Sequence, residues 1–563
     1  MKRFLSLVLF AAMLLCAVPF SAAAAEEPTV VTIGSVRTLS DAWLQHPVIL
    51  EICEKLNITL DFTQYDDDAF SLMLAGGGLA DIVVGSSDYV STILTNKIAM
   101  NLYPLLDEYA PNIKNGQYLN TISVMQGMLD LNADELYMLA PNTGIENAGG
   151  SVQPARGYVV RWDYYKELGC PEINNDDDYI AVVRAMQANH PETADGKKTY
   201  GIGVERSVGD MGGYRASFVA ENYTNPWVFG SYKFKSDFLT SELYDGYTDV
   251  EHSSYWTDME FYNALYREGL FDVDSFTMTY DEWLAKVGNG TYMGLYLCDD
   301  ELYRQMSQKD SETIQVYMVI PSKGAISFAN KLSLLGNFPS GYTFIPAEAE
   351  NWQKALAFLN EMFDENVIRE LYCGKQGEYW DYDENGQPHL FDATFEKQAA
   401  GEMNWGLSGL NMLMPYSATT LHTDGAYINL FEQEEYRSRG LNALQKDFCE
   451  YYGMDYPGQL QQQMADAGDT IDLSNDRGQT ISACISNIPM DIKRILDACN
   501  DILDRAMPRL VMAESDEEFN AIQQEVMQQL EEAEEKSAWE WALEQWNIAK
   551  EKVDPAWLAA KEG

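Results

Sequence analysis

The chain is poor in the residues from which most catalytic and metal sites are built. It has five histidines, His46, His190, His252, His389 and His422, which stand singly without the HExxH spacing of a zinc protease. No Gly-x-Ser-x-Gly nucleophile elbow and no Walker-type phosphate loop occurs. Carboxylate pairs abound among the 87 acidic residues, so no single pair indicates a glycosidase. An enzyme hypothesis therefore has no named nucleophile, and we predict neither catalytic residues nor a cofactor.

Cysteines are few and widely spaced. Of the eight in the chain, seven follow residue 25 and none has the Cys-x-x-Cys spacing of a zinc ribbon or a thioredoxin-like site. An odd number spread this thinly is not a disulfide framework. The sequence favours buried free thiols, with one bridge left open, at Cys53, Cys170, Cys298, Cys373, Cys449, Cys484 and Cys499.

Positive charge is also scarce. Lys and Arg together number 38 against 87 acidic residues, which gives a formal net charge of −49. Such a field repels nucleic acid and anionic membrane surfaces, so we expect neither as a partner. It makes an anionic ligand less favourable without excluding one, because a local pocket can oppose the global field.

The N-terminus has the pattern of a secretory signal. Lys2 and Arg3 precede an apolar core from Phe4 to Phe20, and the small residues Ser21 to Ala25 form a cleavage zone. Leu15 stands before Cys16, where a lipoprotein signal has a small residue, so we predict no lipid anchor at Cys16. No later apolar run is long enough to span a bilayer. We expect a protein cleaved near Ala25 that acts outside the cytoplasm.

What is present is a pattern of alternating strands and helices. At 563 residues the chain is too long for one ordinary core. The first segments read as strand, helix, strand, helix and strand, at Thr29–Ile33, Pro47–Lys55, Ile58–Phe62, Asp66–Ala75 and Ala80–Val84. This order predicts a parallel sheet, and ligands bind beyond the carboxyl ends of such strands. The loops Ser35–Trp43 and Gly85–Tyr89 are therefore candidate cleft loops, or plain connections.

A second unit of the same kind begins at Gln153. A strand at Tyr158–Arg161, a helix capped by Asp163, a longer helix from Asp177 and a strand at Tyr200–Val204 predict a second lobe. Further strands are expected at Gly290–Cys298, Val316–Pro321 and Gly341–Pro346, with helices after Met403. Crossings between the lobes are expected in the Gly/Pro/Asn-rich stretch Pro141–Gly157 and near Thr343–Glu348.

Four stretches carry a family resemblance: VVRWDYYKELG…DGKKTYGIGV from Val159, LEICEKLNITLDFTQYDDDAFSLMLAGGGLADIVV from Leu50, YPLLDEYAPN from Tyr103 and LYCGKQGEYWDYDENGQP from Leu371. Together they resemble extracellular solute-binding protein family 1, the carbohydrate-binding proteins of ABC importers, in its oligosaccharide-binding branch. In the last stretch that branch usually has Gly-x-Glu-Gly, and Gln376 stands here in place of the glutamate.

The resemblance implies an α/β, two-lobed periplasmic-binding-protein-like fold of type II. Each lobe would be a mostly parallel sheet flanked by helices, with a helical C-terminal extension. After the signal peptide 1–25, it implies lobe one at 26–156, lobe two at 157–298, a return to lobe one at 299–345 and completion of lobe two at 346–563. The implied function is capture of a carbohydrate, in particular an oligosaccharide, by a monomer that delivers it to ABC transporter permease subunits.

A sugar site needs aromatic platforms for the apolar faces of the ring and polar groups for its hydroxyls. Residues of both kinds beside expected strand ends, crossings or Gly-rich loops are our candidate ligand contacts. The aromatic candidates are Trp43, Trp162, Trp227, Trp256, Tyr296, Trp380 and Trp405. The polar candidates are Arg37, Asp41, Ser86, Asp88, Asp163, Asp299 and Glu378. Arg161 and Asp163 match the Arg-x-Asp pair of the family, and a structural ion pair with a helix cap explains them equally well.

Several alternatives stay open. Asp381 to Asp392 imitates a calcium loop, although a β-turn at Asn385-Gly386 explains the same residues more simply, and we predict no metal. A secreted carbohydrate-active enzyme, or a binder of peptides or other polar solutes on the same fold, would share the composition. A scaffold or adhesion protein could use the apolar stripe of the C-terminal helices, for which core packing is the simpler explanation.

Overall fold

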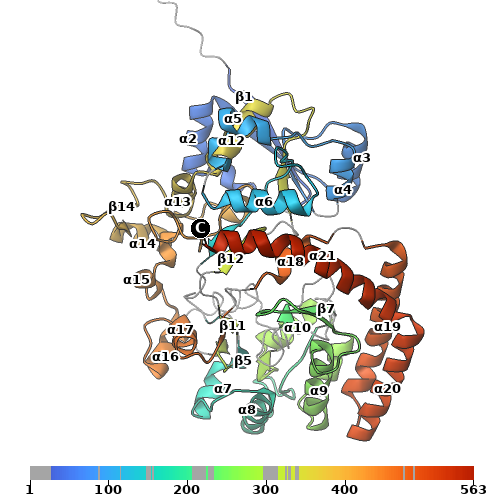
Figure 1. Cartoon of the computed structure of the whole chain (residues 1–563). Coiled ribbons are helices and arrows are strands. Elements are labelled where there is room, and N and C mark those ends of the chain that lie inside the picture. Colours follow the sequence, from blue (N-terminus) through green and yellow to red (C-terminus); the bar gives the residue numbers. More distant parts are fainter. Residues whose placement is uncertain are drawn as a thin grey trace, which may run out of the picture.

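The computed structural model describes residues 27–37, 39–86, 89–114, 116–146, 154, 157–205, 224–225, 234–295, 315–323, 326–327, 331–336, 341–472, 476–485 and 488–562. The chain forms two lobes, which lie one above the other in Figure 1. Lobe one contains the N-terminal sheet, and lobe two contains the sheet that begins with β5 (Tyr158–Arg161). The mixed α/β architecture with two lobes and a helical C-terminal region confirms the expected fold class.

Lobe one is built on a four-stranded sheet in the order β13-β3-β1-β2. Its strands are β1 (Thr29–Ser35), β2 (Ile58–Gln64), β3 (Ile82–Gly85) and β13 (Tyr342–Phe344). β1 runs parallel to β2 and β3, as the sequence predicts, and β13 joins the edge of β3 antiparallel. β3 and the second half of β1 are buried, because their apolar residues pack under helices.

The helices of lobe one begin and end at residues with clear capping chemistry. The ring of His46 accepts a hydrogen bond from Val48 N at the start of α2 (Pro47–Leu56), and Asn57 ends it in the left-handed conformation. Asp66 caps α3 (Asp67–Gly76). The other helices here are α4 (Val90–Thr95), α5 (Leu106–Tyr109), α6 (Tyr118–Met128), α12 (Trp352–Met362) and α13 (Glu365–Cys373).

The return of the chain differs from the expected division. We placed residues 346–563 in lobe two, with a crossing near Thr343–Glu348. β13 completes the lobe-one sheet, within the expected return 299–345. However, β10 (Tyr317–Ile320) of the same stretch pairs with β5 of lobe two, and α12 and α13, which follow residue 345, pack against α2 of lobe one. The amphipathic face of α12, with Leu356, Phe358 and Leu359 fully buried, covers this sheet. The chain next packs on lobe two at α16 (Ala443–Tyr452), where Asp447 accepts a hydrogen bond from the indole N–H of Trp162.

The sheet of lobe two is short and antiparallel, which differs from the mostly parallel sheet that we expect in each lobe. Its order is β10-β5-β9, with β9 at Gly294–Leu295 and β10 at Tyr317–Ile320. The expected parallel strand at Tyr200–Val204 is reduced to isolated parallel bridges from Tyr200 and Ile202. Helices α7 (Trp162–Glu167), α8 (Asp176–Asn189), α9 (Ser254–Arg267) and α10 (Tyr280–Gly288) surround it. A second sheet has the order β6-β7-β8 (Thr224–Asn225, Phe234–Asp237, Leu243–Asp245).

The C-terminal third is mostly helical, as expected. Its helices are α14 (Asp392–Ala399), α15 (Glu434–Arg437), α16, α17 (Gly458–Asp466), α18 (Gly478–Ala483), α19 (Met490–Val511), α20 (Asp516–Glu532) and α21 (Glu535–Glu562). α19 packs against α9, so this part of the C-terminal region belongs to lobe two. Ser515 caps α20, and α21 follows it almost directly.

Two crossings between the lobes lie side by side. β4 (Gly144–Glu146) pairs antiparallel with β12 (Lys331–Ser333), and β12 lies between the lobes in Figure 1. Thr143 N donates to the carbonyl of Pro415, which brings a third segment to the same place. The expected crossing Pro141–Gly157 contains β4, and its residues 147–153, 155 and 156 lie outside the described part of the chain.

Gly157 is where the first crossing enters lobe two, and we predict that alanine is not tolerated there. Its φ of +149° is unusual for an L-residue, and an added Cβ would overlap the carbonyl oxygen of Ile320. Gly157→Ala should therefore lower the free energy of unfolding by about 1–3 kcal/mol. Urea denaturation measures this. The matched control is Gly76→Ala, where an added Cβ has no neighbour within 4 Å and φ is ordinary; an equal loss in both variants would contradict the prediction.

Candidate functional site

Polar residues gather where β1 and β3 end. Ser35 Oγ accepts a hydrogen bond from Arg37 N (3.0 Å) and donates one to the carbonyl of Arg37 (2.8 Å), so the hydroxyl shapes the loop after β1. Gln64, at the end of β2, donates to Ser35 O and accepts from Leu39 N. The loop is thus held by side chains of its own sheet.

This edge of the sheet faces the crossings. Tyr342, the first residue of β13, pairs with Gly85, the last residue of β3, and the chain reaches it from β12. A Cβ added at Gly341 would lie 3.7 Å from Cγ of Arg37. Arg37 and Asp41 are exposed and Ser86 is half-buried, so three of our polar candidates lie at the carboxyl edge of this sheet.

A second loop, η7 (Leu407–Gly409) with Trp405 and Gly406, packs on the first. Cβ atoms added at Gly409 and Gly406 would meet Ser40 O and Ala42 Cβ, respectively. Trp43 is fully buried beneath these two loops, and its ring is edge-on to that of Phe62. We expected Trp43 to be a ligand platform. The structure makes it part of the core on which both loops rest.

Trp405 itself is half-buried and lies among rings. Its centroid is 4.5 Å from that of His46 and 5.8 Å from that of Tyr379, both edge-on. Lys397 Nζ lies 3.9 Å from the centroid of Tyr379 and 3.3 Å from the carboxylate of Glu378, which is exposed. We call Trp405, Tyr379, Glu378 and Lys397 the aromatic patch. It brings together two of our candidates, Trp405 and Glu378, from separate loops.

Sequence reasoning missed Tyr379, Lys397 and His46. Tyr379 directly follows Glu378 in the glycine-rich stretch, a position that could have indicated it. His46 Nε2 bonds to Leu371 O (3.0 Å) while Nδ1 accepts from Val48 N (3.1 Å). Burial lowers the pKa of His46 to about 4 against the opposing effect of the Leu371 carbonyl. His46 is therefore a neutral ring that joins α2 to α13 and supports Trp405.

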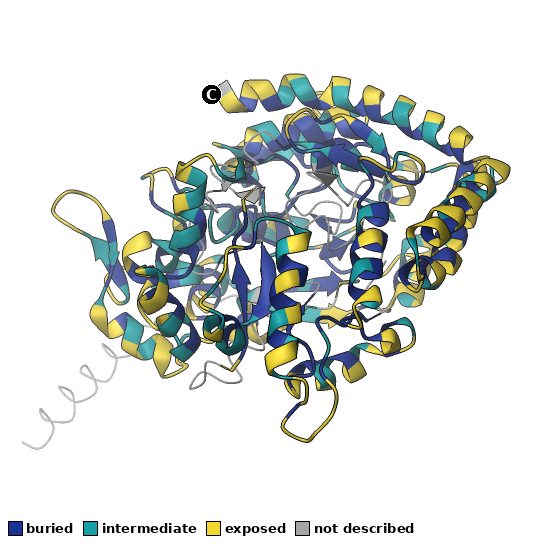
Figure 2. Ribbon diagram, turned by 90° about the horizontal axis from the view of Figure 1, so that it is seen from below, coloured by how far each residue is buried: buried dark blue, intermediate teal, exposed yellow. Residues whose placement is uncertain are grey.

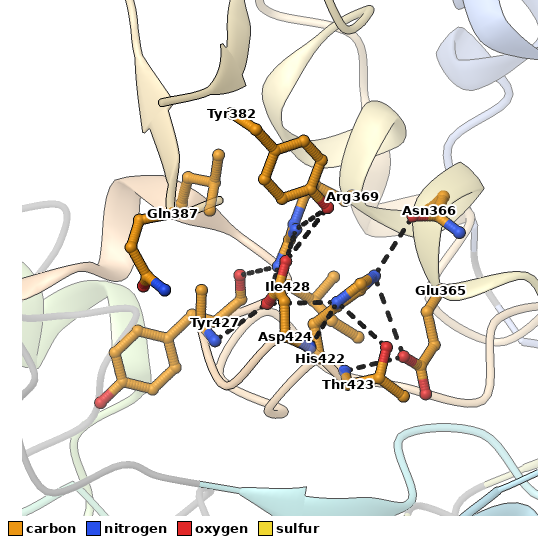
Figure 3. A network of polar contacts seen from close by, with 12 residues as sticks. Glu365, Asn366, Arg369, Tyr382, Gln387, His422, Thr423, Asp424, Tyr427 and Ile428 are labelled. Carbon is orange, nitrogen blue, oxygen red and sulfur yellow. Dashed lines mark hydrogen bonds and ion pairs between the residues drawn. The ribbon is translucent and has the colours of Figure 1, made fainter. Parts of the chain in front are cut away.

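A polar network, drawn in Figure 3, lies between α13 and the loop 420–428. Arg369 is 0% exposed and its guanidinium bonds to both carboxylate oxygens of Asp424, with Nη2–Oδ1 at 3.0 Å, and also to the Tyr427 carbonyl and the Tyr382 hydroxyl. Burial opposes ionisation of Asp424, but the bonds from Arg369 and Ala426 N outweigh it and lower its pKa to about 2. Burial and the nearby guanidinium lower the pKa of His422.

This network fixes the hairpin β14 (Trp380–Tyr382) and β15 (Pro388–Leu390) to α13 and the loop 420–428. Trp380 is buried beside Arg369, with its indole N–H donating to Gly374 O (2.9 Å). Our candidate platform Trp380 is therefore a structural residue. It holds the glycine-rich stretch that presents Glu378 and Tyr379.

The calcium-like motif lies in the turn of this hairpin. Asp383 Oδ1 accepts from Asn385 N and Gln387 N, both at 2.8 Å, and Gly386 N donates to Asp383 O. The β-turn that we favoured is formed. Within the described part of the chain, no three His, Cys, Asp or Glu side chains are placed to hold a metal ion.

Three other candidates lie in lobe two, away from the sheet edge of lobe one. Trp162 donates to Asp447 (2.7 Å), and Trp256 donates to Tyr247 O (3.0 Å); both are fully buried. Asp163 is bonded to Arg161 with Nε–Oδ1 at 2.9 Å. Because β5 runs away from the crossing at Gly157, this Arg-x-Asp pair lies at the start of α7, at the end of lobe two remote from lobe one (Figure 1). The simpler explanation, an ion pair at a helix start, describes it.

The remaining candidates Asp88, Trp227, Tyr296 and Asp299 lie outside the described residues. The six described cysteines are free, and four of them, Cys373, Cys449, Cys484 and Cys499, are buried, as expected for structural thiols. Among the helices that the structure describes, none combines the length and apolar character needed to cross a membrane.

No family model matches the sequence, and a comparison with curated proteins gives no match. Solved structures do match over nearly the whole chain. An HMO-binding, ABC-transporter-associated solute-binding protein from Bifidobacterium longum infantis is 14% identical with a TM-score of 0.56, covering 93% of this chain and 99% of its own.

Two further matches are of the same kind. The alginate-binding protein AlgQ2 is 15% identical with a TM-score of 0.55, covering 93% of this chain and 99% of its own. The Streptococcus pneumoniae ABC-transporter substrate-binding protein FusA, solved with kestose, is 12% identical with a TM-score of 0.55, covering 94% and 100%. The matched proteins are described as binding proteins, and their similarity extends through both lobes. The chain therefore has the two-lobed fold of the ABC-transporter solute-binding proteins.

Proposed function

We propose that the protein is an extracytoplasmic solute-binding protein that captures a carbohydrate, in particular an oligosaccharide, between its lobes and delivers it to an ABC importer. The observation that carries the proposal is the match of 93% of the chain to 99% of an oligosaccharide-binding protein of this fold. The resemblance of the four sequence stretches points to the same family. We further propose that the protein acts as a monomer after cleavage near Ala25, without a lipid at Cys16.

The lobe-one face of the site would consist of the sheet edge and the aromatic patch. Arg37, Asp41 and Ser86 offer donors and acceptors for sugar hydroxyls, and Trp405 and Tyr379 offer ring faces for the apolar side of a sugar. A ligand that contacts both lobes stabilises their closed arrangement. Only its higher affinity for that arrangement shifts the equilibrium, and the closed form is what an importer would recognise.

A thermal-shift screen over mono- and oligosaccharides tests the ligand class. A glycan at about a hundred times its dissociation constant should stabilise the protein by roughly 2.7 kcal/mol. Chromatography of the recovered glycan should show it unchanged, since the proposal involves no chemistry on the ligand. A panel in which a peptide raises the melting temperature while no glycan does would overturn the assignment to carbohydrates.

We predict that Trp405→Ala weakens binding of the glycan found in that screen. Loss of a stacking ring costs about 1.5 kcal/mol, or roughly tenfold in affinity, beyond the lost area. Isothermal titration calorimetry measures the change. Tyr451→Ala is the matched control, because Tyr451 is also a partly exposed ring but lies beside Trp162 at the remote end of lobe two. If the Trp405→Ala variant bound the glycan with the same affinity as the unmodified protein, the aromatic patch would not be part of the ligand-binding site.

A further inference from the structure

The last helix, α21, runs along the boundary between the two lobes. In Figure 1 it crosses the molecule between α6 of lobe one and α18 of lobe two. Figure 2 shows it along one outer edge of the molecule, with its outward face exposed. α21 packs against α6 on one side and against α18, α19 and β8 on the other. It thus contacts both lobes at once.

One apolar stripe serves both contacts. Buried residues recur along the whole helix at spacings of three and four, the period of a single helix face. They are Ala538, Ala542, Trp546, Ala549, Val553, Trp557 and Ala560. The stripe lies on the buried face of a helix that packs against α6 of lobe one and against α18, α19 and β8 of lobe two.

Its attachment to lobe two is made of several polar contacts. Trp546 donates its indole N–H to Ser241 O (2.9 Å), and Lys550 Nζ donates to Thr240 O (3.0 Å), both in the turn between β7 and β8. Asp554 pairs with Arg477, which precedes α18, and Arg477 also lies 5.2 Å from the centroid of the Trp557 ring. These contacts, with the chain connection through α19 and α20, bind α21 firmly to lobe two.

Its attachment to lobe one is lighter. α21 packs against α6, and Lys552 Nζ lies 2.9 Å from the carboxylate of Asp130, in the turn that ends α6. Asp130 has a φ of +51°, a left-handed conformation that aspartate and asparagine tolerate better than most residues. The side chains of Lys552 and Asp130 are 35% and 83% exposed, so the ion pair is solvated and its strength is modest.

From these contacts we propose that α21 is an interlobe strap, fixed on lobe two and holding lobe one through α6 and the Lys552–Asp130 pair. The crossings join the lobes covalently, and the strap adds a non-covalent connection along one outer edge. Any rotation of the lobes that separates α6 from α18 must break the packing of α21 against one of these two helices. The strap therefore biases the unliganded protein toward the arrangement in which both lobes contact α21.

Single-molecule energy transfer on the full mature chain tests this without ligand, and so independently of the proposed function. Dyes go on non-natural residues at Leu72 in α3 and Val273 in lobe two, both exposed, which leaves the native thiols untouched. Lys552→Glu replaces attraction to Asp130 by repulsion. It should raise the ratio of molecules in which α6 has separated from α21 to molecules in which both lobes contact α21 by roughly 1.4- to 5-fold, the range of an exposed ion pair.

Adding Asp130→Asn to Lys552→Glu should reverse part of that change, because it removes the repulsion and suits the left-handed backbone. Lys536→Glu is the matched control, since Lys536 is on the same helix and its ion pair is with Glu540 of α21. The proposal is overturned if Lys552→Glu leaves the distribution unchanged, if Lys536→Glu alters it equally, or if the two changes at 130 and 552 add independently. Equal melting temperatures verify that the variants are folded.

Discussion

Replacing Asp424 by asparagine is expected to lower the free energy of unfolding by about 3–5 kcal/mol, because it leaves a buried guanidinium without its counter-charge. Arg369 is 0% exposed and Asp424 only 17%, and the pair is bonded through both carboxylate oxygens. Asparagine keeps the shape but offers a single carbonyl oxygen. Chemical denaturation followed by tryptophan fluorescence measures the loss, which the buried Trp380 near Arg369 should report.

Asp392→Asn provides the comparison for this substitution. Asp392 also pairs with an arginine, Arg439, but its side chain is 91% exposed, and such pairs contribute roughly 0–1 kcal/mol. If Asp424→Asn lowered the free energy of unfolding no more than Asp392→Asn does, the network of Figure 3 would not be what holds the β14–β15 hairpin in place.

Raising the pH should destabilise the protein through two carboxyl groups buried at the start of α21. Glu535 is 4% exposed, its Oε1 has no hydrogen-bond partner among the described residues, and it lies beside Asp245, which is also buried. Asp245 accepts bonds from Tyr247 N and the Thr248 hydroxyl. Burial, and then the neighbouring Asp245, raise the pKa of Glu535 to about 8; burial also raises the pKa of Asp245.

The sign follows from proton linkage. The pKa of Glu535 in the folded state lies above its ordinary value of 4.5, so its proton favours the folded state. This stability is complete below about pH 4.5 and is lost as the pH rises through about 8. The side chain in Glu535→Gln cannot ionise. The free energy of unfolding of this variant should therefore exceed that of the unmodified protein by on the order of 2–4 kcal/mol at pH 9 and by little at pH 4.5.

Denaturation curves at intervals from pH 4.5 to 9 measure this difference. Glu540→Gln makes the same chemical change at an exposed position of α21 and should give a pH dependence parallel to that of the unmodified protein. If the free energies of unfolding of Glu535→Gln and the unmodified protein differed by the same amount at every pH from 4.5 to 9, Glu535 would be ionised in the folded state.

The first half of lobe one could be predicted from sequence because its signals are local. The strands β1, β2 and β3 and helices α2 and α3 follow from runs of apolar residues and from caps such as Asp66, within a residue or two of their bounds. The parallel order of β1, β2 and β3 follows from the alternation of these elements. The exposed positions of Arg37 and Asp41 follow from the rule that loops lie at the carboxyl ends of strands.

The aromatic candidates were harder to judge, because sequence position does not reveal burial. Trp162, Trp256 and Trp380 lie beside strand ends, turns or glycines, yet each is buried with its indole N–H satisfied by a distant or local acceptor. The direction of β5 relative to the crossing was also needed to place Asp163. Such facts depend on contacts between segments far apart in the sequence, as with Arg369 and Asp424.

The position of β13 has a consequence for how the chain acquires its structure. β13 pairs with β3, although more than half of the polypeptide must be made before Tyr342 exists. Until then the outer edge of β3, an entirely apolar strand apart from Gly85, has open backbone donors and acceptors. Non-local pairings of this kind slow folding. An emerging chain thus carries an aggregation-prone edge for nearly half of its synthesis, from the completion of β3 to that of β13, and we expect holding chaperones to bind it during that interval.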